Sequence, residues 1–317
     1  MLFRSLLEAV LLAFPDSVGR RRRRGEDEVV FARGGSGKVA PTSVVKEPEF
    51  LVVVDADGRR GRGVKIRAAS AIEPEWLLGH FPDRIRETRE VVFREEREGV
   101  EVVEQLLYED LVLDEETRSD LTGEDVSAVL SQTIWDRELR GLCQGDDLEN
   151  WRARIALAAE HIEGLEPLDD TALRAALDKL CIGARSIDDL RQRGGLEGMV
   201  TLHCGDQLAL VKRLAPAFVS IPGRRRVPVH YEGGKPPWIE SRLQDFFGAV
   251  EGPRVARGAV PLVLHLLAPN MRAVQVTTDL KGFWRRHYPD IRKSLRRRYH
   301  KHHWPEDPLA KKAPRSK

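Results

Sequence analysis

Residues 50–58, FLVVVDADG, and residues 64–69, VKIRAA, decide the fold of the first part of the chain. The first stretch begins as an apolar, valine-rich run, and the second alternates apolar with charged residues. Both patterns are typical of β-strands. Asp57-Gly58 follows the apolar run, and Asp-Gly favours a tight hairpin turn because both central turn residues need positive φ. These residues therefore predict a β-hairpin with its turn at Asp57-Gly58.

Similar strand-like stretches lie on both sides of this hairpin, at residues 28–33, 90–93 and 100–107. Turn sequences such as Gly34-Gly35-Ser36-Gly37 and Arg97-Glu98-Gly99 separate several of them. Five short strands at this spacing favour a small barrel or curled sheet. We therefore expect an OB-like β domain over residues 19–115.

The rest of the chain changes character twice. Residues 116–214 have the helical period, as in Leu173, Leu177 and Leu180 on one face, and predict a helical segment. Residues 215–308 return to mixed patterns and predict an α/β C-terminal domain. Its expected β elements are 226–231, 262–267 and 273–277. The fold class is therefore α+β.

The two ends are short. Residues 1–18 begin with a helical stripe that is closed by Pro15, and this stripe predicts one short amphipathic helix. The stripe consists of Leu2, Leu6, Ala9, Val10 and Ala13. Residues 309–317 are basic and contain Pro314, so they predict a disordered tail.

The charge is unevenly distributed along the chain. The 52 Lys and Arg nearly balance the 50 Asp and Glu, which gives a net charge of +2. However, residues 101–150 hold 15 acidic and 3 basic residues, whereas residues 281–317 hold 13 basic and 3 acidic residues. A basic C-terminal end favours a polyanionic partner. No apolar run approaches the roughly 20 residues of a membrane-spanning helix, so we expect no membrane partner.

Cysteine usage predicts the compartment. The chain has 3 cysteines and no CxxC pair, which excludes a disulfide scaffold or a thiolate zinc site. We interpret them as reduced thiols of a cytoplasmic protein.

Sequence motifs for nucleotide or metal chemistry fail. A P-loop needs glycine five residues before Gly-Lys and a hydroxyl residue after it. Gly37-Lys38 has Ala32 and Val39 at those positions, and Gly234-Lys235 has Val229 and Pro236. His300, His302 and His303 have no carboxylate or thiol at ligand spacing nearby. We therefore expect no catalytic residues, no metal and no cofactor in this chain.

The last part of the chain interleaves basic and aromatic residues. Five aromatic residues fall within the 22 residues 283–304. Thr277-Thr278-Asp279 predicts the start of one helix, and Pro289 predicts the first turn of a second. Arginine interleaved with aromatic residues fits phosphate neutralisation and base stacking. The alternative is a solvated basic face over an aromatic core, and we interpret Trp284 and Tyr299 as core residues.

Several blocks of this region resemble the bacterial DEAH-box ATP-dependent helicases of the HrpB family. The blocks, in family order, are VPVHY (227–231), GKPPW (234–238), RLQDFFG (242–248), PLVLHLLAPN (261–270), VQVTTDL (274–280), GFW (282–284) and YHKHHWPEDP (299–308). The resemblance is strongest over residues 214–308. In addition, LLAFPD (11–16) resembles the end of the ratchet domain of that family, so the resemblance implies that residues 1–18 are the end of a ratchet-type helical domain. Two positions depart from the family pattern, because Ala273 and His300 stand where the family has proline.

The resemblance implies a function. The chain has no phosphate-binding loop, no DEAH box and no QRxGR motif, so it is similar to the accessory part of a helicase without the ATPase motor. ATP and magnesium would belong to that motor, and a separately encoded motor is a possible partner. The expected partner of this chain is RNA or another single-stranded nucleic acid.

Twelve residues are the candidate contacts. Trp238, flanked by Pro236 and Pro237, is the expected exposed stacking residue. The expected phosphate contacts are Arg224, Arg225, Arg226, Lys235, Arg242, Arg285, Arg286, Arg292, Lys293, Arg296 and Arg297. Two alternatives stay open: a protein-docking module with a basic face for an acidic partner, and an inactive relic of a split helicase.

Overall fold

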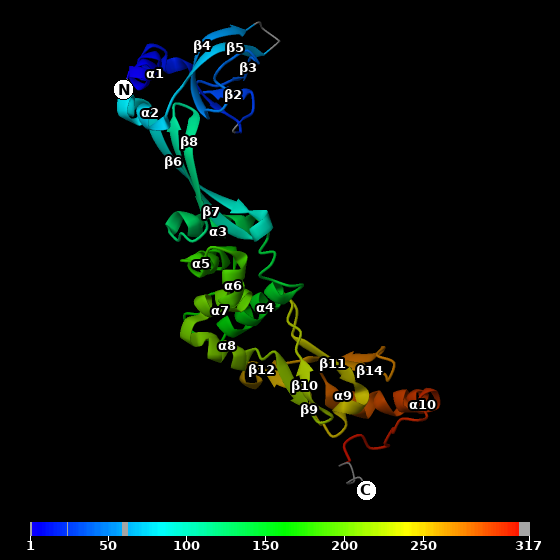
Figure 1. Cartoon of the computed structure of the whole chain (residues 1–317). Helices are drawn as coiled ribbons and strands as arrows, with labels where there is room; N and C mark the ends of the chain where they lie inside the picture. Colours follow the sequence, from blue (N-terminus) through cyan, green and yellow to red (C-terminus); the bar gives the residue numbers. More distant parts are fainter. Residues whose placement is uncertain (1, 24, 59–62, 311–317) are drawn as a thin grey trace, which may run out of the picture. The chain divides into compact units, whose positions relative to one another are not determined.

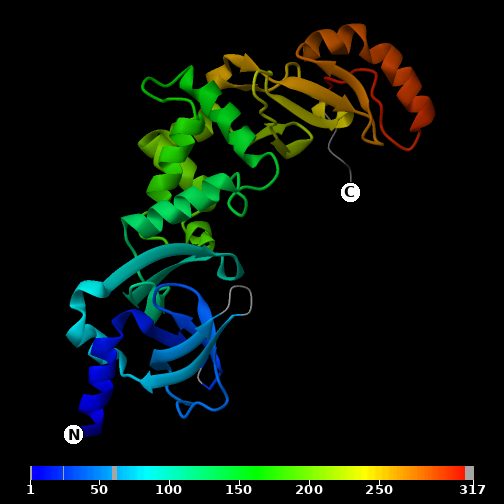
Figure 2. The same cartoon turned by 90° about the horizontal axis from the view of Figure 1, so that it is seen from above.

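The computed structural model describes residues 2–23, 25–58 and 63–310. The chain forms two compact units, Met1–Val129 and Leu130–Lys317 (Figures 1 and 2). Both units combine helices with sheets, which confirms the α+β class. The five predicted domain ranges stay predictions.

Unit 1 contains a closed barrel in which the strands follow the order β1-β2-β3-β5-β4. β3 and β5 pair in parallel, and the other neighbours pair antiparallel. The five strands are β1 (Val18–Arg21), β2 (Glu28–Phe31), β3 (Ser36–Val39), β4 (Phe50–Gly58) and β5 (Val64–Ala71).

The apolar run at the start of β4 is explained by burial on both of its faces. Leu51 and Val53 pack inside the barrel with Val29 and Ile66. Phe50 and Val52 face the opposite side and pack in a second cluster. A strand that is buried on both faces reads as a continuous apolar run instead of an alternating one.

The predicted hairpin exists, but its turn lies elsewhere. Asp57 and Gly58 are inside β4 and pair with Lys65 and Val64. The connection therefore falls at residues 59–63, of which 59–62 lie outside the described residues.

Two of the strands predicted for the barrel belong to a separate sheet. Residues 90–93 and 100–107 lie in β6 (Ile85–Arg94) and β7 (Gly99–Tyr108), which form an antiparallel sheet with β8 (Leu111–Arg118). Their places in the barrel are taken by β1 and β3, which are only four residues long and carry arginine, lysine and glycine. Such strands have no apolar alternation to reveal them.

Unit 1 also contains the helices α1 (Leu2–Ala13) and α2 (Pro74–His80). The predicted N-terminal helix is confirmed, but among the stripe residues whose side chains are described only Val10 is partly buried. Leu11 is fully buried, with Leu7 and Val10 partly buried against the same cluster, whereas Leu6 is 61% exposed.

A buried arginine fixes the long loop between β3 and β4. Arg21 of β1 is 1% exposed. Its guanidinium donates hydrogen bonds to the carbonyl oxygens of Pro48 (2.9 Å), Val45 (2.7 Å) and Glu26. Pro48 and Val45 belong to this loop, so the buried guanidinium holds the loop from within, and Arg20 adds an ion pair to Glu49 of the loop at 2.7 Å.

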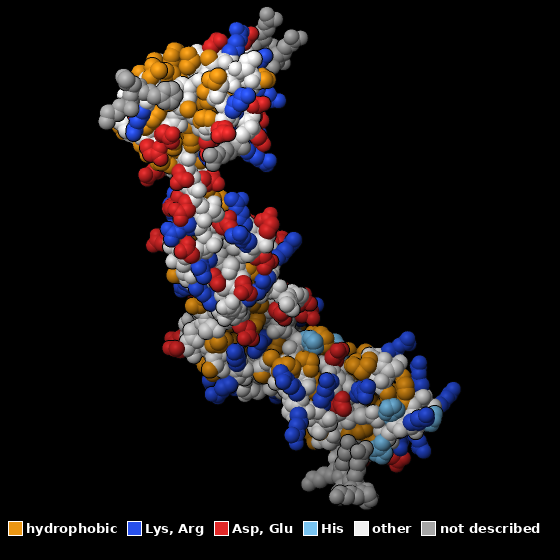
Figure 3. All heavy atoms as spheres, in the orientation of Figure 1, with side chains coloured by type: hydrophobic (Ala, Val, Ile, Leu, Met, Phe, Trp, Pro, Cys, Tyr) orange, Lys and Arg blue, Asp and Glu red, His pale blue; other side chains and the backbone are white. Residues whose placement is uncertain are grey.

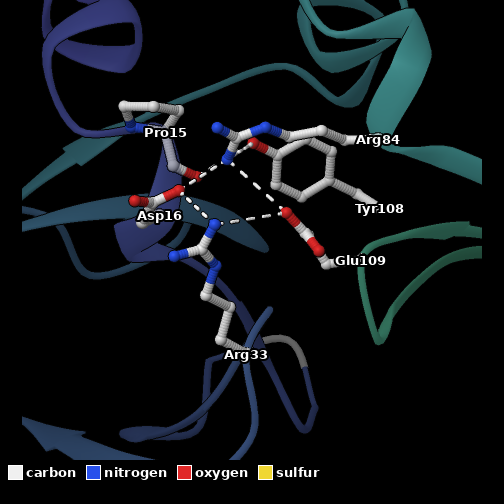
Figure 4. Close-up of polar contacts among 6 residues, drawn as sticks. All are labelled: Pro15, Asp16, Arg33, Arg84, Tyr108 and Glu109. Carbon is white, nitrogen blue, oxygen red and sulfur yellow. Dashed lines mark hydrogen bonds and ion pairs between the residues drawn. The ribbon is translucent and has the colours of Figure 1, made fainter.

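A polar cluster joins separate segments of unit 1 (Figure 4). Arg84 and Arg33 donate to the carboxylate of Asp16 at 2.5 and 2.8 Å, and both lie 3.5 to 3.6 Å from Glu109. Tyr108, which is fully buried, donates its hydroxyl to the carbonyl of Pro15 at 2.9 Å. The hydrogen bond from Arg84 lowers the pKa of Asp16, and burial raises the pKa of Tyr108.

We expect Tyr108→Phe to lower the stability of unit 1 by about 1 kcal/mol, because the Pro15 carbonyl loses its donor.

We expect Asp16→Asn to make the stability of unit 1 depend less on pH in the acid range. The lowered pKa of Asp16 means that its contribution is present above the unfolded pKa, near pH 4, and is lost as the pH falls below it. Urea midpoints between pH 6 and pH 3 measure both effects.

Asp114→Asn is the matched control, because Asp114 is an exposed carboxylate of the same unit without an ion pair in the described part of the chain. An acid profile of Asp16→Asn that coincides with the wild-type profile would contradict the role of Asp16.

The predicted helical region is confirmed as helical. Ser186 accepts a hydrogen bond from the Asp189 amide and so caps α6 (Ile187–Gln192). Leu173, Leu177 and Leu180 are buried as expected. The helices are α3 (Glu124–Asp136), α4 (Asp147–Ala159), α5 (Asp170–Cys181), α6 (Ile187–Gln192), α7 (Gly195–Cys204) and α8 (Leu208–Leu214).

The C-terminal part of unit 2 is built around one core that runs from Ala215 to Trp304. Its central sheet has the order β11-β14-β15, with β11 parallel and β15 antiparallel to β14. The elements are β9 (Phe218–Ile221), β10 (Arg224–Pro228), β11 (Trp238–Arg242), β12 (Arg254–Val255), β13 (Val260–Pro261), β14 (Val263–Leu267), β15 (Ala273–Thr277), α9 (Leu280–Arg286) and α10 (Tyr288–Arg298).

The sequence predicted β14, β15, α9 and α10, and its expected strand 226–231 overlaps β10, but it missed β9, β11, β12 and β13. Asp279 caps α9 by accepting a hydrogen bond from the Gly282 amide, and Pro289 lies in the first turn of α10. Ala273 and His300, the two departures from the family pattern, are both exposed.

The ends of the chain and its helix lengths add two findings. Of the predicted tail 309–317, residues 311–317 lie outside the described residues, and Leu309 packs against the C-terminal core. Within the described residues, no helix combines the length and the apolar character needed to cross a bilayer.

Candidate nucleic-acid interface

The structure places the twelve candidate residues in two groups in the C-terminal part of unit 2. One group lies on β10, β11 and the segment between them, and the other on α9 and α10. Figure 3 shows Lys and Arg side chains, with histidines among them, over the region that contains these elements.

Arg224, Arg225 and Arg226 form the exposed strand of a two-stranded hairpin with β9, which we call the arginine hairpin (residues 218–228). Arg224 pairs with Ile221 and Val227 with Val219, so three steps along β10 match two along β9. This β-bulge breaks the alternation of faces. Without it, Arg225 would share the inward face of the fully buried Val227; with it, all three arginines are exposed.

The turn of the arginine hairpin is anchored to the core. The Gly223 amide donates a 2.7 Å hydrogen bond to the carbonyl of Asp245. A Cβ atom at Gly223 would lie 2.5 Å from the Cα of Asp245, so only glycine fits there. Asp245 in turn accepts a hydrogen bond from the Ser241 hydroxyl at 2.6 Å. Arg242 precedes Asp245 by three residues and is exposed near this anchor.

These four arginines are free to bind an anion. Among the described residues, no carboxylate lies within ion-pair distance of Arg224, Arg225, Arg226 or Arg242. Arg226 stacks on the ring of Phe218, with 3.8 Å between its guanidinium carbon and the ring centroid. Phe218 is 42% exposed.

Phe218 is the residue that sequence reasoning missed. The alternation in Phe218-Val219-Ser220-Ile221, followed by a Pro-Gly turn and three arginines, is a hairpin pattern that would have placed Phe218 beside the arginines.

Trp238 is not the exposed stacking residue that its flanking prolines suggested. Its ring is stacked between His230 and His265, at centroid distances of 3.9 and 4.5 Å. Its indole nitrogen donates to Glu232, which also accepts from Lys235 at 2.6 Å. The Lys235 hydrogen bond lowers the pKa of Glu232. Both faces of Trp238 are therefore occupied, and Lys235 is paired within the protein.

On the helix pair, three of the candidate cations have internal partners. Arg292 is not a free phosphate contact: its side chain is 19% exposed and donates to the Trp304 carbonyl and to Glu306, both at 3.0 Å. Arg286 pairs with Asp279 at 2.7 Å, and Lys293 pairs with Asp290 at 3.1 Å.

The remaining candidate cations of the helix pair, Arg285, Arg296 and Arg297, are exposed, and within the described residues they have no carboxylate partner. On the inner face of α10, Leu295 is buried, and Ile291 and Tyr299 pack against the C-terminal core, which confirms the interpretation of Tyr299 as a core residue. Trp284 is buried, as expected of a core residue.

The thiols of the chain are not activated. Cys143, Cys181 and Cys204 are free, and burial raises the pKa of each, to about 11 for Cys181. A raised pKa keeps a thiol protonated at neutral pH and makes it a poor nucleophile.

Comparison with known proteins shows that this chain is similar to helicases. Residues 176–308 match the family HrpB_C, described as the C-terminal region of ATP-dependent helicases. One relative is the ATP-dependent RNA helicase HrpB of Escherichia coli (strain K12), which is 28% identical to this chain over 320 residues. That alignment covers 96% of this chain and 39% of the relative, so the chain spans about two fifths of the length of HrpB.

A solved structure supports the same fold. The crystal structure of the E. coli DExH-box NTPase HrpB matches with a TM-score of 0.55 and 24% identity, over 96% of this chain and 38% of that chain. The predicted resemblance to the C-terminal region of the HrpB helicases is thereby confirmed.

Proposed function

We propose that this chain is an accessory nucleic-acid-binding region of an HrpB-type ATP-dependent helicase, and that it binds single-stranded RNA without an ATPase activity of its own. The arginine hairpin carries the proposal. It holds three consecutive arginines without a carboxylate partner in the described part of the chain, on a bulged strand, with Arg242 near its anchored turn. Cations that are not neutralised by a carboxylate attract a phosphate backbone and release its counterions on binding.

The remaining parts have supporting roles in this proposal. Arg285, Arg296 and Arg297 supply a second, weaker cationic surface, because their neighbours Arg286, Arg292 and Lys293 are already paired. We assign the barrel of unit 1 to the OB class of small barrels, whose strands and loops bind oligonucleotides in other proteins. We assign no ATP or magnesium site to this chain, and we propose that both belong to a helicase motor outside it.

Replacing Arg224, Arg225 and Arg242 together with alanine is expected to weaken the binding of fluorescein-labelled oligouridine and of other single strands alike. Each lost phosphate contact removes about 0.7 from the slope of log K against log salt for single strands. We therefore expect the slope to fall in magnitude by about 2. Fluorescence anisotropy at salt concentrations from about 50 to about 200 mM measures this slope.

The control removes the same charge from a surface outside the barrel. Arg4, Arg86 and Arg97 of unit 1 are exposed and ion-paired to Glu8, Asp110 and Glu101. The triple alanine variant of these residues is expected to keep the wild-type slope. Absence of oligouridine binding by the wild-type chain at low salt would contradict the proposal and would favour a protein-docking role.

A further inference from the structure

Phe218 stands out among the exposed apolar residues of unit 2. Within the described part of that unit, the large hydrophobic side chains with the most exposed surface are Ile182, Leu202, Phe218, Val250, Met271 and Val276. Phe218 alone is aromatic, and it alone lies on the arginine hairpin. We infer that Phe218 stacks on a base of a bound single strand while the arginines beside it hold the flanking phosphates. This inference rests on the proposed function and adds a base-stacking residue to it.

The position of Phe218 on β9 shows that its exposure is not a packing accident. The next residue, Val219, packs against the C-terminal core, and Ile221 is 6% exposed. The face of β9 that carries Val219 and Ile221 therefore packs on the core, and Phe218 lies on the other face. Phe218 pairs with Pro228, the last residue of β10, at the open end of the hairpin. An aromatic ring at this position contributes nothing to the buried core.

Arg226 stacks on the Phe218 ring and leaves part of the residue exposed to a base. Its guanidinium lies 3.8 Å from the ring centroid, which is the geometry of a cation–π pair. The planar guanidinium covers part of the ring, yet 42% of the residue is still exposed. Arginine that stacks on an aromatic ring keeps its N–H groups at the edge, where a phosphate can accept from them.

The hairpin holds this arrangement in place before any ligand arrives. The bulge between Arg224 and Val227 brings all three arginines to the exposed side, and the bond from Gly223 to the Asp245 carbonyl fixes the turn. A preformed site loses less conformational entropy on binding. Phosphate contacts alone would suit any polyanion, whereas an exposed ring favours bases that are not already stacked in a duplex.

The test compares two probes of equal charge. One is a labelled oligouridine, and the other is an abasic ribose-phosphate oligomer of the same length. The wild-type chain is expected to bind oligouridine about 5-fold or more tightly than the abasic oligomer, the ratio that corresponds to one stacked base. Phe218→Leu is expected to bring that ratio close to 1 and to leave the salt slope unchanged. Phe218→Trp is expected to keep the ratio, and Met271→Leu is the exposed apolar control.

The outcomes separate this inference from the proposed function. If Phe218→Leu binds oligouridine as the wild type does, the stacking role is overturned while the proposed function stands. If Phe218→Leu weakens both probes equally, Phe218 only positions Arg226 and the stacking role is also overturned. If the wild-type chain binds neither probe, the proposed function fails and the inference fails with it.

Discussion

Arg21→Leu is expected to destabilise the barrel by about 3 kcal/mol or more. The guanidinium donates to three carbonyl oxygens, those of Pro48, Val45 and Glu26, and the residue is 1% exposed. A hydrogen bond from a charged donor contributes about 1.5–3 kcal/mol, and water can recover part of the loss at Glu26, which is exposed. The urea midpoint of unit 1 and the hydrogen exchange of residues 40–49 measure the loss, which we expect to appear first in that loop.

Arg23→Leu is the matched control for Arg21→Leu. Arg23 is a neighbouring arginine with an 83% exposed side chain and a 3.8 Å ion pair to Glu26. Replacement of an exposed arginine of this kind changes stability by about 0.5 kcal/mol or less. Arg21→Lys is expected to recover little, because one ammonium cannot reproduce the planar fork that reaches three acceptors. Equal stabilities of Arg21→Leu and Arg23→Leu would disprove the structural role of Arg21.

Arg154→Ala is expected to destabilise unit 2 by about 2–4 kcal/mol. Arg154 of α4 is 6% exposed, donates to the Ala215 carbonyl at 2.8 Å and lies 4.1 Å from the centroid of the Trp151 ring. Burial lowers its pKa. A hydrogen bond from a charged donor contributes about 1.5–3 kcal/mol, and a desolvated cation–π pair can add about 2 kcal/mol.

The location of Arg154 predicts where the loss is seen. Ala215 begins the C-terminal core, and the neighbouring Pro216 carbonyl accepts a 2.9 Å bond from the Tyr231 hydroxyl. Hydrogen exchange is therefore expected to rise over residues 215–231 before it rises elsewhere. Arg213→Ala on α8 is the control, because Arg213 is exposed. The role assigned to Arg154 would be wrong if exchange over 215–231 were the same in both variants.

Much of the fold follows from periodicity, and the misses have physical causes. The run from Phe50 to Val53 predicts a strand because it must satisfy two cores at once. The five arginines from Arg20 to Arg24 show no apolar alternation, yet Arg20 and Arg21 belong to β1. Arg21 bonds only to backbone carbonyls, and a partner that consists of backbone leaves no trace in the amino-acid sequence.

The sequence predicted which residue types form the candidate site better than it predicted which of these residues are available to a ligand. Arg224, Arg225 and Arg226 are exposed, as a run of three arginines suggests. Trp238 and Arg292 look equally available in the sequence but are occupied by His230, His265, Glu306 and the Trp304 carbonyl. These partners lie 8 to 27 residues away in the chain and are brought close only by strand pairing and by the return of the chain after α10. Spacing rules for neighbouring residues cannot anticipate them.

The strand order of the barrel has a consequence for its assembly. The chain supplies the barrel in two pieces, a meander of β1, β2 and β3 followed by a hairpin of β4 and β5. Each piece has two open edges, which are closed only when β1 meets β4 and β3 meets β5. During synthesis from the N-terminus, residues 18–39 must wait for residues 50–71 with both edges unpaired. Unpaired edges are where strands from different molecules join. The interval before β5 leaves the ribosome is therefore the period in which this domain is most prone to aggregate.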